Sequence, residues 1–158
     1  MKLARTIRLD ESDDNVFENP ADAGEWAISG GFEFSDWDES NLKGKPRQAF
    51  TNGWLSIDSF GRATFVAVSP ITESEYIALG QKLALHFVEH YGAPDERTAL
   101  PVAQEELEHM RAMCEDHEDN TVVMISRSLT DTGVHESFRF SGPQDASLDT
   151  FAVHGSVD

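Results

Sequence analysis

Two neighbouring segments with helical periodicity constrain this chain more than any other feature. The first begins at Thr72, which together with Glu75 matches a capping box. Apolar and small residues then recur on one helical face until Gly92 ends the pattern: Ile77, Gly80, Leu83, Ala84, Phe87, Val88 and Tyr91. This pattern predicts a helix from Thr72 to about Tyr91 with one face that must be buried.

A second helix is predicted after the turn at Pro94. Its apolar positions recur at spacings of four, three and four residues: Ala103, Leu107, Met110 and Cys114. Two adjacent amphipathic helices need a further layer against which to pack their apolar faces.

That layer is supplied by runs rich in aromatic and β-branched residues. They lie at 2–9, 25–34, 50–57, 62–68, 121–129 and 134–140. We therefore expect an α+β fold, with a predominantly antiparallel sheet of about six strands and the two adjacent helices packed on one face. The predicted core is Ile28, Phe32, Leu55, Phe65, Val66, Leu83, Phe87, Leu107, Met110, Val123 and Ile125.

The chain length of 158 residues fits one domain with one core. We assign residues 1–142 to this domain. The remaining residues, 143–158, are small and polar, and we expect a loosely ordered C-terminal tail.

A net charge of −17 excludes several classes of partner. Such a surface repels phosphate backbones, so we expect no nucleic acid and no anionic membrane as partners. Cys114 is the only cysteine, which excludes an internal disulfide and a cysteine-rich zinc module. Because the N-terminus has no apolar signal-peptide region, a cytoplasmic location is expected.

One segment, residues 43–65, runs against the acidic composition. Here the side chains of Lys45, Arg47 and Arg62, with Trp54 nearby, suggest a site for an anionic small molecule or an acidic segment of a partner protein. The structural alternative is that these cations pair with the protein's own acids, including the loop at 10–25. We consider the structural alternative the stronger of the two.

A metal site is a third hypothesis. Glu106 and His109 have the spacing found in carboxylate-bridged metal centres of helical bundles, and His86 and His90 lie on the preceding helix. Cys114, however, falls in the apolar stripe and is more simply a core residue. We therefore assign no metal ligand.

No nucleophile elbow, phosphate-binding loop or dinucleotide fingerprint is present in the sequence. We therefore predict no catalytic residues and no cofactor. The preferred interpretation is a non-enzymatic binding or accessory protein. A small enzyme or ligand-binding domain with its site at residues 43–65 is the alternative.

Four stretches resemble a bacterial family of uncharacterised short proteins: KLARTIRLDESDDNVF, GEWAISGGFEF, GKPRQAFTNGWLSIDSFGRATF and HFVEHYGAPD. The likeness spans most of residues 2–117. It implies a bacterial cytoplasmic protein with an accessory role linked to a molybdenum-dependent oxidoreductase system, and it supplies no catalytic residues.

Because antiparallel sheets leave edges that need covering, we also expect a homodimer.

Overall fold

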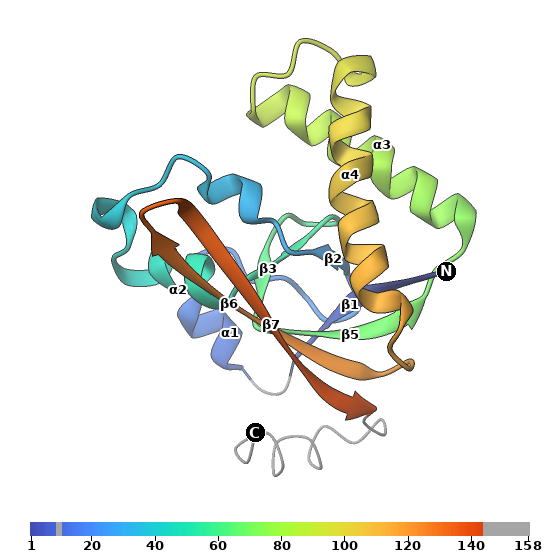
Figure 1. Ribbon diagram of the computed structural model, residues 1–158, viewed down its shortest axis with the longest axis horizontal. Coiled ribbons are helices and arrows are strands. Elements are labelled where there is room, and N and C mark those ends of the chain that lie inside the picture. The colour runs from blue at the N-terminus through green and yellow to red at the C-terminus, as the bar shows by residue number, and fades with distance from the viewer. Residues whose placement is uncertain (9–10, 144–158) are drawn as a thin grey trace.

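The structure, a computed structural model, describes residues 1–8 and 11–143. Over these residues, seven antiparallel strands form one sheet in the order β4-β3-β2-β1-β5-β6-β7 (Figure 1). The strands are β1 (Lys2–Ile7), β2 (Trp26–Ile28), β3 (Trp54–Ser56), β4 (Arg62–Ala63), β5 (Phe65–Pro70), β6 (Thr121–Thr130) and β7 (Gly133–Pro143).

The two predicted helices are confirmed as α3 (Glu73–His90) and α4 (Glu96–Glu115). The capping box is formed: the Thr72 hydroxyl accepts from the Glu75 N–H at 3.2 Å, and the Glu75 carboxylate accepts from the Thr72 N–H at 3.1 Å. The helices pack against each other, and α4 also lies against β1 and β2 (Figure 1). The α+β fold with an antiparallel sheet is thereby confirmed.

The seventh strand arises because the predicted run at 62–68 is broken at Thr64. The hydroxyl of Thr64 donates to the Asp13 carboxylate at 2.7 Å, and its N–H donates to the same group at 3.4 Å. Asp13 belongs to a short helix, α1 (Ser12–Val16), within the segment that was expected to be a loop. This side-chain contact divides the run into β4 and β5.

Two other expected strands are wrong in part. The run at 25–34 ends at Ile28, because Gly30 takes a left-handed conformation (φ 72°) and a 3₁₀-helix, η1 (Gly31–Phe34), follows. The run at 50–57 is a strand only over β3, and the basic residues before it lie on a helix, α2 (Gly44–Asn52). A second short 3₁₀-helix, η2 (Glu39–Asn41), precedes α2.

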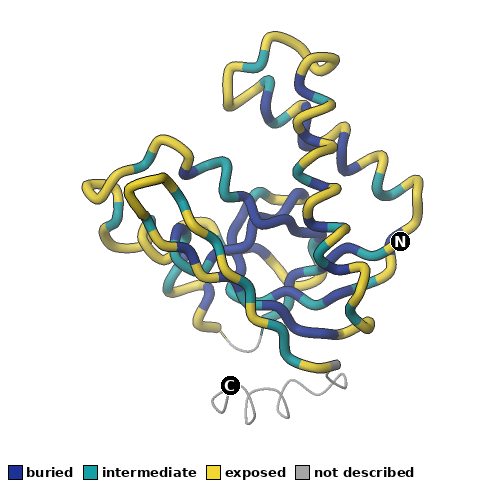
Figure 2. Tube along the Cα trace, viewed as in Figure 1, coloured by how far each residue is buried: buried dark blue, intermediate teal, exposed yellow. Residues whose placement is uncertain are grey.

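The core lies between the sheet and the long helices (Figure 2). Nine of the predicted core residues are buried: Ile28, Leu55, Val66, Leu83, Phe87, Leu107, Met110, Val123 and Ile125. Phe32 and Phe65 are only half-buried. The exposure of Phe32 is informative, because its ring faces the cleft described below.

The predicted tail at 143–158 lies outside the described residues except for the backbone of Pro143, so it stays a prediction. Within the described ranges, α3 and α4 are the longest helices, and neither they nor any other helix has the length and apolar character needed to cross a membrane.

Candidate functional site

Arg62 of β4 is a buried cation that fixes the bend after β2. Its guanidinium donates to the carbonyl oxygens of Ser29 (3.4 Å), Gly30 (3.3 Å) and Gly53 (3.0 Å), and to the Glu33 carboxylate at 2.5 Å. Burial lowers the pKa of Arg62 to about 10, although Glu33 opposes this change. The side chain therefore remains charged at neutral pH.

Arg127 of β6 is a second buried cation directed at the same bend. Its Nε donates to the Glu136 carboxylate at 2.8 Å. The rest of the guanidinium donates to the carbonyl oxygens of Ser29, Ala49, Phe50 and Gly53. Both guanidinium groups lie over the ring of Phe34, at 4.7 and 5.1 Å from its centre.

The two consecutive glycines of the bend leave room for this arrangement. A Cβ atom on Gly30 would lie 2.4 Å from the Leu55 Cβ, and one on Gly31 would lie 2.5 Å from the Glu136 carboxylate. Ser29 completes the bend, since its hydroxyl donates to Glu136 at 3.3 Å and accepts from the Gly31 N–H at 3.4 Å. The bend is therefore a closely packed unit in which the Ser29 hydroxyl and the Ser29 and Gly30 carbonyl oxygens are hydrogen-bonded.

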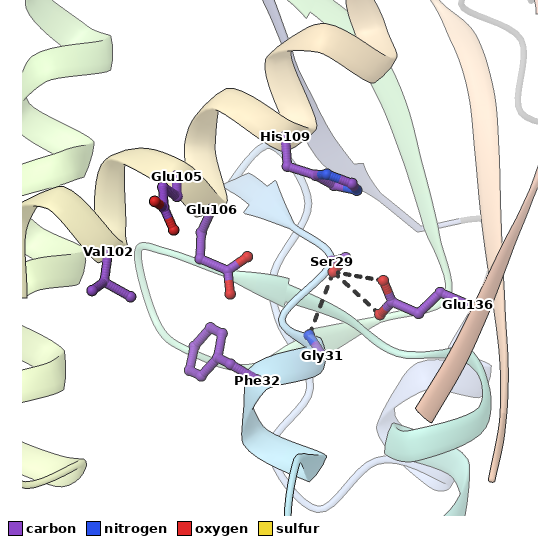
Figure 3. Close-up of a pocket in the computed structure, with 8 residues that line it drawn as sticks. All are labelled: Ser29, Gly31, Phe32, Val102, Glu105, Glu106, His109 and Glu136. Atoms are coloured by element: carbon purple, nitrogen blue, oxygen red, sulfur yellow. Dashed lines mark hydrogen bonds between the residues drawn. The ribbon is translucent and has the colours of Figure 1, made fainter. Parts of the chain in front are cut away.

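A cleft of about 380 Å³ opens between this bend and α4 (Figure 3). Its floor consists of Ser29, Gly31 and Glu136, and α4 forms one wall. Figure 3 shows Glu106 extending from α4 into the space above Phe32 and Gly31. The complete lining is Ser29, Gly31, Phe32, Val102, Glu105, Glu106, His109 and Glu136.

A second hollow, of about 290 Å³ and mostly apolar, adjoins the first. The two share Phe32, Val102 and Glu106. The Phe32 ring is held edge-on by Phe87 and Tyr91, at centroid distances of 5.0 and 5.4 Å. The further lining residues are Ala93, Thr98 and Ala99. We call the two adjoining hollows together the α4 cleft; the first is its acidic end and the second is its apolar end.

The acidic end contains carboxylates in two different states. Glu136 faces the Arg127 guanidinium, whereas Glu105 and Glu106 form no ion pair with any residue of the described ranges. Burial raises the pKa of Glu106, the nearby Glu136 raises it further, and His109 acts in the opposite direction. Glu106 is thus a half-buried carboxyl group directed into a cavity, with His109 rather than a Lys or Arg beside it.

The four residues predicted for an anion site lie in three different environments. Trp54 is fully buried, with its indole N–H donated to the Val123 carbonyl at 3.2 Å. Arg62 is the buried cation described above. Lys45 and Arg47 are exposed on α2, and because they are two apart on a helix they do not share a face. Lys45 and Arg47 therefore do not point toward one common site, and the anion site at residues 43–65 stays a prediction.

A hollow of about 250 Å³ nevertheless joins two of these residues. Lys45 and Arg62 line it together with aromatic and acidic side chains: Phe17, Glu18, Glu33, Phe34, Trp37 and Phe60. Arg47 and Trp54 are not part of its lining. Within the described ranges, Lys45 and Arg47 form no ion pair, whereas Arg62 pairs with Glu33.

The residues considered for a metal site do not come together as a set. Glu106 and His109 share the α4 cleft, but Cys114 is buried in the core. His86 stacks on Phe60 and lies next to His90, and neither histidine lines the cleft. Over residues 1–8 and 11–143, no group of three or more His, Cys, Asp or Glu side chains is arranged to hold a metal ion.

Comparison with known proteins places the whole chain in one family, since a single family description matches residues 1–158. The chain belongs to DUF6505, a family of unknown function. The predicted resemblance to an uncharacterised family is thereby confirmed. No curated protein and no solved structure matches the chain.

For this DUF6505 chain, the cleft residues outside α4 were not identified from sequence. Ser29 and Gly31 are close in sequence, but Ser29 and Glu136 are separated by 107 positions along the chain. The consecutive glycines Gly30 and Gly31 are the local sequence signal of the bend. Arg127 and Glu136, opposite each other in the β6–β7 register, are a cross-strand pair that sequence could have indicated.

Proposed function

We propose that this DUF6505 protein is a non-catalytic binding protein and that its ligand occupies the α4 cleft. The observation that carries this proposal is the continuity of the two hollows at Phe32, Val102 and Glu106. Ligand sites in proteins are concave, largely preformed and lined by apolar groups with a few placed polar groups. The α4 cleft has each of these properties.

The chemistry of the cleft floor supports binding rather than catalysis. Ser29 is the hydroxyl nearest to a carboxylate there, but its partner Glu136 is already neutralised by the Arg127 guanidinium. The carboxylate therefore accepts a structural hydrogen bond from Ser29 and pairs with Arg127, rather than standing as a free base beside a nucleophile. The Cys114 thiol is buried in the core, and burial raises its pKa to about 12, so it is mostly protonated at neutral pH.

We place the protein in the bacterial cytoplasm as an accessory factor and propose a client in a molybdenum-dependent oxidoreductase system. The support is the resemblance described above and the chain's negative charge, which suits binding to a protein rather than to nucleic acid. Capture of such an oxidoreductase from lysate by the wild-type chain, but not by a cleft variant, is the expected result. If the wild type and the cleft variant both capture the oxidoreductase, this client does not bind through the cleft.

The proposed occupancy of the cleft is tested by filling it. Val102 and Ile77 are both helix residues with nearly equal exposure, 52% and 53%, but only Val102 lines the cleft. We expect Val102→Trp to lose bound small molecules and captured proteins, detected by native mass spectrometry, while Ile77→Trp retains them. Identical profiles for wild type and both variants would overturn the proposal.

A second site, for an anionic ligand, is favoured by the hollow that Lys45 and Arg62 share. Lys45 has no acidic partner among the described residues, and Trp37 and Phe60 supply an aromatic wall. The Arg62 guanidinium is already bonded to Glu33 and three carbonyl oxygens, so Lys45 is the cation left to meet an anion. Arg47 and Trp54, outside the lining, would act only indirectly.

We also propose a two-fold dimer. The outer edge of β4 is covered, because the Ala21 N–H donates to the Arg62 carbonyl and the Arg62 N–H donates to the Asn19 carbonyl, both at 2.8 Å. At the opposite edge, residues 133–140 of β7 pair with β6 alone among the described strands. Light scattering at low and at physiological salt tests this, since a charge of −17 per chain opposes association where screening is weak.

A further inference from the structure

We propose that the α4 cleft recognises an organic cation, an ammonium or guanidinium group carried on a short apolar body. This inference rests on the proposed function, because it names the class of ligand that the same cleft takes. The cation would lie beside Glu106, and the apolar body would lie against Phe32, Phe87 and Tyr91.

The first support is the balance of charge around the polar hollow. Three carboxylates line it, those of Glu105, Glu106 and Glu136, beside the single imidazole of His109, and no Lys or Arg does. Arg127 neutralises only Glu136 from behind. An anionic ligand would be repelled by the two carboxylates that remain, whereas a cation would form charge-assisted hydrogen bonds with them.

The second support is the position of the aromatic wall. Phe32 belongs to both hollows, so its ring borders the place where the polar and apolar ends meet. Aromatic faces attract ammonium and guanidinium groups, and neighbouring aromatic rings accommodate the apolar body to which such groups are attached. A bare metal ion would leave this wall unused, and the described residues provide no three-ligand set for one.

The third support is the way the site is held. The Gly30–Gly31 bend, fixed by Arg62 and Arg127, sets the position of Phe32 at the start of η1. Glu106 extends from the opposite wall, on a helix of 20 residues. The two groups that would contact the cation and its body therefore come from rigid elements and do not have to be assembled by the ligand.

The probe is phenethylammonium, compared with neutral phenethyl alcohol and anionic phenylacetate by calorimetric titration at neutral pH. We expect phenethylammonium to bind about tenfold or more tightly than the alcohol, the ratio typical of one charge-assisted hydrogen bond, and phenylacetate to bind least. Glu106→Gln should remove most of this preference. Glu96→Gln removes the same charge from the same helix outside the cleft and should retain it.

The results separate the ligand class from the site. If the ammonium and the alcohol bind equally, and Val102→Trp abolishes both, the cation inference is overturned and the cleft stands as a binding site. If phenethylammonium fails to bind, or binds equally well to Glu106→Gln, the inference is likewise overturned. If every probe still binds to the Val102→Trp variant, both the inference and the proposed function are contradicted.

A capped dipeptide of phenylalanine and lysine distinguishes two sources of the same chemistry. Tighter binding of the dipeptide than of phenethylammonium would assign the cleft to a basic side chain of a partner protein. Tighter binding of phenethylammonium would assign it to a free amine. In either case Glu106→Gln should weaken the tighter ligand, and an unchanged affinity would contradict the role given to Glu106.

Discussion

The floor and the helical wall of the α4 cleft both carry carboxylates, but their surroundings differ. In the floor Glu136 meets the buried Arg127 guanidinium, and below the bend Glu33 meets Arg62 in the same way. On the wall Glu105 and Glu106 pair with no Lys or Arg of the described ranges, and the imidazole of His109 lies on the same wall. Paired charges inside a protein hold its structure, whereas charges left unpaired beside a cavity are available to a ligand. The floor should therefore respond to mutation through stability and the wall through binding.

The largest expected effect concerns the floor. Arg127→Met should destabilise the protein by about 3–5 kcal/mol, because it leaves Glu136 without its cation and removes one donor from each of four carbonyl oxygens. Two of these oxygens, those of Ser29 and Gly53, still accept from Arg62. Chemical denaturation measures this loss. Arg127→Lys keeps the charge but not the planar fork, so it should recover only part of the stability. A loss below about 1 kcal/mol for Arg127→Met would show that the floor is not held by this charge.

The next effect tests the bend itself. Gly30→Ala places a methyl group 2.4 Å from the Leu55 Cβ at a position with φ 72°. Gly24→Ala is the matched control, because Gly24 has φ 84° and no heavy atom within 4 Å of an added Cβ. The control should cost about 1–2 kcal/mol for backbone strain alone. Gly30→Ala should reduce the free energy of unfolding by about 1–3 kcal/mol more than the control does. Equal losses for the two variants would mean that Leu55 moves aside without an energetic cost.

A smaller effect, of opposite sign, is expected on the helical wall. Because the pKa of Glu106 is raised above its ordinary value of 4.5, folding favours the protonated form. The stability of the wild type should therefore fall, relative to Glu106→Gln, as pH rises above 4.5 and through the raised pKa. Below 4.5 the two proteins should converge, since Glu106 is then protonated in both states.

Thermal unfolding across this pH range measures the difference, which we expect to stay below about 1 kcal/mol because Glu106 is half-buried and solvent screens it. Glu96→Gln is the control. It removes a carboxylate from the first turn of the same helix, where the helix dipole favours negative charge, so its effect should be slightly destabilising. A wild type that gains stability over Glu106→Gln with rising pH would contradict the interpretation of the wall.

The difference between floor and wall also explains what sequence could predict. The helices α3 and α4 were predictable because their apolar periodicity and the capping box are local signals. Strand lengths were less predictable where a distant side chain intervened. Asp13 breaks the run at Thr64. The segment 44–52, which contains Lys45 and Arg47, forms α2 and buries Phe50.

The cleft was only half predictable for the same reason. Glu106 and His109 are close in sequence, so their spacing on α4 drew attention to them. Their neighbours Ser29 and Glu136 meet them only through sheet pairing across the whole domain. Arg62 was noticed as a surplus cation, but its burial under the bend follows from Gly30 and Gly53 carbonyl positions that no local pattern encodes.

The smallest expected effect concerns the exposed cations of α2, which contrast with the buried arginines of the floor. Lys45→Gln and Arg47→Gln should each change stability by no more than about 0.5 kcal/mol, since neither side chain has an ionic partner among the described residues.

The informative measurement is binding of an anionic probe, phenylacetate, followed by tryptophan fluorescence. Trp37 lines the hollow beside Lys45, whereas Trp54 is buried and hydrogen-bonded. If the hollow takes anions, Lys45→Gln should weaken the probe several-fold and Arg47→Gln, outside the lining, should not. If Lys45→Gln and Arg47→Gln bind phenylacetate equally well, both side chains are solvated surface. Ligand recognition is then assigned to the acidic cleft alone.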